Sequence, residues 1–267
     1  MGFFKKMLSS VGIGSAKVDT VLDKEEYVPG EMVEGVVKIK GGNTEQEIAG
    51  LYFSIQSTYE DVRVVSVEDE DGDREEEERD ITSTAVLKKF KISDDFVISP
   101  GDEMEIPLSF QLPYTTPLTM GKTKVWISTG LDIKKAIDKG DRDYIKVVPE
   151  PFVQAFLDSM DELDFDLVEV DCEAVSDSWR SVPFVQEFEF KPISGPFARR
   201  LDEVEAIFFP EEDRLKVYME MDLKTRGIPS ILAHFMDEDE SRVKFDFERD
   251  DIPDLTERLH DIIDNWS

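Results

Sequence analysis

Apolar and polar residues alternate along two stretches of the chain, and each stretch follows a turn of the form Pro-Gly-acid. The first turn is Pro29-Gly30-Glu31 and the second is Pro100-Gly101-Asp102. A period of two is typical of a β-strand with one face in a core and the other in water. The two patterns therefore favour an all-β sandwich. Their apolar positions are Met32, Val33, Gly35, Val37 and Ile39, and Met104, Ile106, Leu108, Phe110 and Leu112.

Similar runs continue through the N-terminal half and predict a β-sandwich over residues 15–149. Seven or eight strands joined by loops with Gly, Pro, Asn and Asp are typical of that architecture. At 267 residues the chain is long enough for two domains, and we predict two. The strands expected in this half are 16–22, 32–39, 48–59, 62–67, 81–92, 103–112, 122–129 and 143–148.

The pattern of apolar and polar residues changes after Pro149 and Pro151. This change predicts a second, β-rich domain over residues 150–267. Apolar spacing indicates a short helix after Pro151 and an amphipathic helix at the end of the chain, beginning near Pro253. We expect the apolar stripe of this last helix to pack into the protein's own core. The alternative is that the stripe binds in a groove of a partner. The expected fold class is all-β, with two consecutive β-sandwich domains. Strands are expected here at 165–172, 184–190, 204–209, 214–222 and 243–247.

Residues 1–14 form a separate unit, predicted to be a short amphipathic helix that ends at Gly12 and Gly14. Its apolar stripe is expected to dock on the protein's own sandwich. The alternative is that it contacts a partner or a membrane, with two lysines as weak anchors. The candidate partner contacts are Phe3, Phe4, Lys5, Lys6 and Leu8.

The chain is strongly acidic, with 61 Asp and Glu against 31 Lys and Arg and a formal charge of -30. Such a field repels bare nucleic acid and anionic lipid, so neither is expected as a partner. No run of apolar residues approaches the length of a membrane-spanning helix, so no stable membrane insertion is expected. Most of the acids are interpreted as a solvated surface.

Residues 68–80 hold ten carboxylates and two arginines in thirteen residues, which predicts a long hairpin loop. Asp69, Asp71, Asp73 and Glu78 occupy positions three, five, seven and twelve of a calcium-binding loop. Position one would then be Val67, where a carboxylate is expected, and the flanking residues read as strands. These four residues are therefore only weak candidates for a metal site.

Groups suited to catalysis are scarce. Cys172 is the single cysteine, so it cannot form an intramolecular disulfide and is interpreted as a buried structural residue of a cytoplasmic protein. His234 and His260 are the two histidines, and neither lies near it in sequence. No glycine-rich phosphate loop opens a helix. The sequence therefore predicts no catalytic residues, no enzymatic activity and no cofactor.

Several motifs in order along the chain resemble the bacterial sporulation-control family usually called Spo-zero-M. The resemblance implies an arrestin-like fold, with an N-terminal β-sandwich followed by a second β-rich domain. It also implies a cytoplasmic, non-enzymatic regulator of early sporulation or of cell shape and division. The motifs are Phe3-Phe4-Lys5-Lys6-Met7-Leu8, Tyr27-Val28-Pro29-Gly30-Glu31, Gly41-Gly42, Leu112-Pro113, Thr129-Gly130-Leu131-Asp132-Ile133, Ala136-Ile137-Asp138-Lys139 and Pro183-Phe184-Val185-Gln186-Glu187-Phe188-Glu189-Phe190.

Two functional hypotheses follow. The first is an adaptor that recruits proteins of division, the cytoskeleton or sporulation signalling through sheet edges, a groove between the domains or the terminal helices. The second is an ion or small-molecule binding module that uses the acidic loop 68–80 or the cleft between the domains. The sequence does not identify the partner, and it leaves a dimer open.

Overall fold

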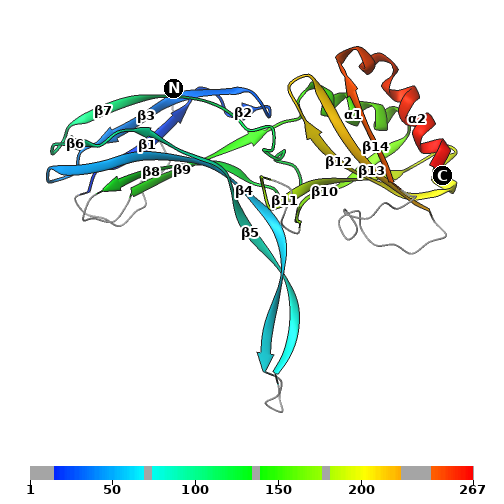
Figure 1. The fold of residues 1–267 in the computed structure, drawn as a ribbon, viewed down its shortest axis with the longest axis horizontal. Coiled ribbons are helices and arrows are strands. Elements are labelled where there is room, and N and C mark those ends of the chain that lie inside the picture. The colour runs from blue at the N-terminus through cyan, green and yellow to red at the C-terminus, as the bar shows by residue number, and fades with distance from the viewer. Residues whose placement is uncertain (1–14, 69–73, 134–138, 176–180, 224–241, 267) are drawn as a thin grey trace.

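The computed structural model describes residues 15–68, 74–133, 139–175, 181–223 and 242–266. Figure 1 shows two β-rich halves joined side by side, with a long two-stranded ribbon extending away from them. The strands are β1 (Lys17–Leu22), β2 (Glu26–Tyr27), β3 (Met32–Lys40), β4 (Gln46–Glu68), β5 (Arg74–Ser93), β6 (Phe96–Ile98), β7 (Glu103–Gln111), β8 (Val125–Ile133), β9 (Lys139–Val147), β10 (Phe165–Ala174), β11 (Phe184–Pro192), β12 (Leu201–Pro210), β13 (Arg214–Leu223) and β14 (Arg242–Glu248). The α-helices are α1 (Pro151–Glu162) and α2 (Leu255–Trp266).

The N-terminal half is a sandwich, as its alternating pattern predicts. Strands β1, β3 and β7 form one antiparallel sheet, and β4, β8, β9 and β2 follow one another in the facing sheet. Alternate residues of β3 and β4 point into one core, which includes Val33, Val37, Phe53 and Ile55. Strands β2 and β6 are short elements that the sequence pattern did not indicate.

The two Pro-Gly-acid turns share one hydrogen-bonding scheme. The carboxylate of Glu31 accepts a hydrogen bond from the amide of Val28 at 3.2 Å, and that of Asp102 accepts one from the amide of Ser99 at 3.2 Å. Each turn also needs a glycine in the left-handed region, because φ is +85° at Gly30 and +79° at Gly101. The acid and the glycine together therefore fix the entry into the following strand.

The β4–β5 ribbon corrects two expectations. The strands predicted at 48–59 and 62–67 form one strand, β4, and much of the predicted loop 68–80 belongs to β5, which begins at Arg74. The pairing of β4 with β5 extends to Glu68 opposite Arg74. On a thin ribbon, side chains of both faces reach water, so many like charges can be carried without preventing backbone pairing.

The C-terminal half consists of β10 to β14 in one antiparallel sheet, with α1 and α2 together on one of its faces (Figure 1). The all-β class is confirmed, but two helices stand where a second sheet was predicted in this half. The helices cover this sheet because α1 and α2 each have an apolar stripe. These stripes pack against aromatic side chains of the sheet. Phe156 of α1 lies 6.0 Å from Phe190 and 4.9 Å from Phe208 between ring centroids.

Both helices predicted in this half are present. Glu150 caps α1, since its carboxylate accepts hydrogen bonds at 2.8 Å from the amides of Phe152 and Val153. In α2, Leu255, Leu259 and Ile263 are buried, which confirms that the stripe packs into the core. None of the helices in the described parts of the chain is long and apolar enough to span a membrane.

Candidate functional site

The outer part of the β4–β5 ribbon is the first candidate site. β4 pairs with β8 only as far as Ser57 and with β10 at Glu60, so beyond that point the described backbone pairing is between β4 and β5 alone. Figure 1 shows this part extending away from both halves. Open strand edges of this kind can pair with an extended segment of another protein.

One face of the ribbon combines exposed apolar and acidic side chains. Val62 and Val64 are 56% and 59% exposed on one face, where they lie opposite Asp80 and Glu78 of β5. Side chains two residues apart share a face, so apolar and acidic groups alternate across it. This face suits a partner segment that combines apolar and basic side chains.

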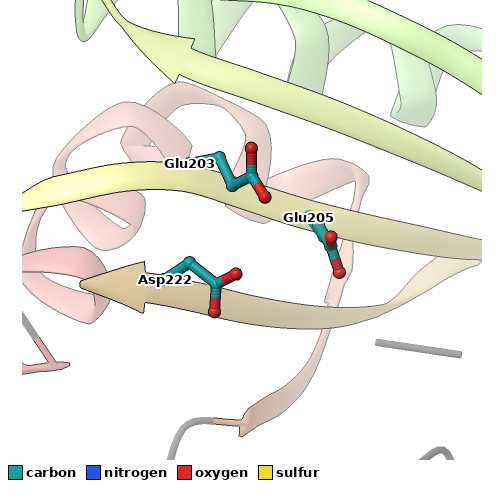
Figure 2. Close-up of side chains that lie close together, drawn as sticks. All are labelled: Glu203, Glu205 and Asp222. Carbon is teal, nitrogen blue, oxygen red and sulfur yellow. The ribbon is translucent and has the colours of Figure 1, made fainter. Parts of the chain in front are cut away.

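A second candidate site is the acidic sheet face, which we define as Glu187, Glu203, Glu205, Glu220 and Asp222. These residues belong to β11, β12 and β13 and lie on the side of the sheet opposite the helices, because their neighbours in sequence point into the helix-covered core. Glu205 is directly opposite Glu220, and Glu203 is opposite Asp222. Figure 2 shows Glu203, Glu205 and Asp222 gathered on the two neighbouring strands.

Burial distinguishes this acidic sheet face from the solvated acids elsewhere. Glu205, Glu220 and Asp222 are only 7%, 6% and 5% exposed. Burial raises the pKa of Asp222 to about 7, and the charges of Glu220 and Glu203 add to the rise. The pKa of Glu187 is raised to about 9, mainly by burial and then by Glu205.

A lysine and two unpartnered carboxylate oxygens lie in this region. Lys191 lies 2.7 Å from Glu189 and 3.3 Å from Glu203 between nitrogen and oxygen. Asp222 Oδ2 and Glu187 Oε2 are buried and have no hydrogen-bond partner. Like charges directly opposite one another destabilise a sheet, so the register places acids where counter-charges or protons must offset their repulsion.

One ligand oxygen from each of Glu203, Glu205 and Asp222 lies within 4.8 Å of the others. Sequence reasoning missed this cluster, although a signal was present. Acids recur two residues apart on three successive strands, as Glu187 and Glu189, Glu203 and Glu205, and Glu220 and Asp222. That spacing places each pair on one face, but strand register, which brings the pairs together, is not visible in the sequence.

The predicted site residues are only partly placed. Asp69, Asp71 and Asp73 lie outside the described residues, while Glu78 is exposed in β5 opposite Val64. The calcium-loop hypothesis therefore stays a prediction. The N-terminal contact candidates also lie outside the described residues and stay predictions: Phe3, Phe4, Lys5, Lys6 and Leu8.

Cys172 is a buried structural residue, as predicted. It is 3% exposed, and burial raises the pKa of its thiol to about 12. The hydroxyl of Thr123 lies 3.3 Å from its sulfur. His260 is on α2, 5.3 Å from the ring of Phe197 between centroids, and His234 lies outside the described residues. A thiol that holds its proton so tightly does not serve as a nucleophile.

The whole chain matches known proteins. The family model described as SpoOM protein matches residues 4–225. The chain belongs to the sporulation-control protein family. It is 40% identical over 270 residues to the sporulation-control protein spo0M of Bacillus subtilis (strain 168), with all of both chains covered. The crystal structure of Spo0M from Bacillus subtilis matches with a TM-score of 0.79 and 37% identity, covering 96% of this chain and 100% of that one.

These matches confirm the resemblance stated from the motifs. The agreement in fold extends across both halves of the chain, since nearly all of it is covered by the solved relative. The division of the chain at residues 14 and 149 is not tested by the matches and stays a prediction.

Proposed function

We propose that this protein is a cytoplasmic, non-enzymatic regulator that controls sporulation, or cell division and shape, by binding other proteins. Membership of the sporulation-control family supports the regulatory role. Cys172 is buried and its pKa is raised, so its thiol is not suited to act as a nucleophile. The partners we propose belong to division, the cytoskeleton or sporulation signalling.

The outer β4–β5 ribbon is the observation that carries the proposal. It presents two open strand edges and a face on which Val62 and Val64 alternate with carboxylates. A solitary two-stranded ribbon gains little stability from exposing apolar side chains, so a binding role accounts for them better than a structural one. The partner segment that fits is extended, apolar and basic.

Affinity capture from the protein's own host tests this proposal. The intact chain is compared with a Val62→Thr/Val64→Thr variant, which keeps the shape and strand propensity of both positions. Because the two valines are about half exposed, their burial by a partner contributes about 1 kcal/mol each, and the variant should bind about tenfold or more weakly. Val97→Thr, at a position 54% exposed on β6, is the matched control.

We expect a specific protein that is lost from the ribbon variant and retained by the control. Equal recovery of every partner by all three chains would show that the ribbon face is not the contact surface. Absence of any specific partner across a range of salt concentrations would count against the adaptor function itself.

A further inference from the structure

The acidic sheet face carries an inference that is independent of the proposed adaptor function. We propose that Glu203, Glu205 and Asp222 bind one divalent cation of the calcium type on the side of the sheet opposite the helices. All three ligands are carboxylates, which are the groups that hard cations such as Ca²⁺ prefer. The site lies about two strands away from the ribbon-bearing half, in the order β4, β10, β11, β12 and β13.

The first argument is geometric. Glu203 and Glu205 stand on β12, and Asp222 stands directly across from Glu203 on β13. Their ligand oxygens lie within 4.8 Å of one another (Figure 2). Two oxygens bound to one Ca²⁺ at about 2.3 to 2.6 Å can lie up to about 5 Å apart, and three spread evenly around it up to about 4.5 Å, so the spacing of the three oxygens is close to the span of one Ca²⁺. For Mg²⁺, the corresponding limit is only about 4 Å.

The second argument is the unsatisfied oxygen of Asp222. This residue is 5% exposed, and its Oδ2 is buried without a hydrogen-bond partner. Buried polar atoms without partners are rare, because each one costs free energy that water would otherwise offset. Figure 2 shows Asp222 beside the two glutamates, and one of its carboxylate oxygens lies within 4.8 Å of an oxygen of each.

The third argument is electrostatic. Three carboxylates meet here, and Glu220 lies directly opposite Glu205. Lys191 contacts Glu203 at 3.3 Å, and Arg242 of β14 pairs opposite Glu220 in the backbone register. A divalent ion would neutralise the repulsion that the sheet register imposes.

Calorimetric titration of the full-length chain, stripped with EDTA and kept at physiological ionic strength, tests the site with CaCl₂ as the probe. We expect saturable binding of one Ca²⁺ per chain, with weaker binding of Mg²⁺ in a parallel titration. Asp222→Asn should weaken Ca²⁺ binding at least about tenfold, because a charged ligand is lost while the shape is kept. Glu78→Gln is the comparison variant, since it removes an equal charge from the exposed ribbon and tests the calcium loop predicted there.

Measurements of stability show whether Asp222→Asn has lost a Ca²⁺ ligand or has a damaged fold. Without Ca²⁺, Asp222→Asn should be at least as stable as the parent chain, because it removes repulsion from Glu220 and Glu203. With Ca²⁺, the melting temperature of the parent should rise and that of the variant should not. Glu203→Gln is a second variant at a more exposed position and should also bind Ca²⁺ more weakly.

The proposal is overturned if the parent chain shows no saturable Ca²⁺ binding. It is also overturned if Asp222→Asn binds as tightly as the parent, or if Glu78→Gln abolishes binding, which would assign the ion to the hairpin instead. Equal affinities for Mg²⁺ and Ca²⁺ would contradict the size argument. None of these results bears on whether the ribbon recruits a protein.

Discussion

Glu187 should make the protein less stable as the pH rises. Burial raises the pKa of its carboxyl to about 9, and the nearby Glu205 and Glu173 add to the rise. Its Oε2 is buried without a hydrogen-bond partner, so no donor favours the ionised form at that atom. The folded chain therefore keeps a proton that the unfolded chain releases near the ordinary value of 4.5.

The sign and the size of the effect follow from this difference. Below the unfolded pKa both states are protonated, and the stabilisation by protonated Glu187 is complete. It is lost as the pH rises from about 4.5 to about 9, where the folded state also ionises. One pKa unit corresponds to about 1.4 kcal/mol, so the full shift sets an upper limit of about 6 kcal/mol. Because neighbouring carboxyls share in the titration, we expect about 2 to 4 kcal/mol.

Urea unfolding followed by circular dichroism, in EDTA and at several pH values between 5 and 9, measures this loss. Glu187→Gln imitates the protonated carboxyl, so it should match the parent near pH 5 and exceed its stability by about 2 to 4 kcal/mol near pH 9. Glu78→Gln, on the exposed ribbon, should follow the parent throughout. Parallel curves for the parent and Glu187→Gln would refute the reasoning, because Glu187 would then titrate alike in both states.

Three further predictions concern the cap of α1, the core and the thiol. Glu150→Ala should lower the free energy of unfolding by about 2 kcal/mol in urea denaturation, because it leaves the amides of Phe152 and Val153 without an acceptor. Burial raises the pKa of Glu150, so the neutral acceptor in Glu150→Gln should cost less than about 1 kcal/mol, and equal losses would contradict this. Phe156→Ala should cost about 3 to 5 kcal/mol by the same assay, since this fully buried ring joins α1 to the sheet, and a loss below about 1 kcal/mol would mean that α1 is not fixed there. Cys172 should react with a thiol reagent only as fast as the chain unfolds, and immediate reaction at pH 8 would contradict its burial.

Much of the fold follows from local patterns in the sequence. The alternation after Gly30 and Gly101 predicts β3 and β7 closely, and the apolar spacing after Pro151 and Pro253 predicts both helices. These elements are readable because each contains its own periodicity and its own turn or cap. The family resemblance is likewise carried by short motifs distributed along the chain.

The features that the sequence did not indicate depend on which strands pair and in which register. Charge favoured a loop over residues 68–80, but backbone pairing with β4 makes Arg74–Asp80 part of a strand. In the C-terminal half, α1 and α2 cover one face of a single sheet. No single segment of the sequence specifies that the helices take this position. The acidic sheet face also arises from register, since Glu203 and Asp222 are far apart along the chain.

Photo-crosslinking in the protein's own host tests whether the outer β4–β5 ribbon is the surface that binds other proteins. A photoreactive phenylalanine analogue is placed at Val64 and, as the control, at Val97, which is similarly exposed on β6. If the ribbon binds a partner, we expect a discrete adduct with a host protein from position 64 and none from position 97. No adduct from position 64, or the same adducts from both positions, would contradict it.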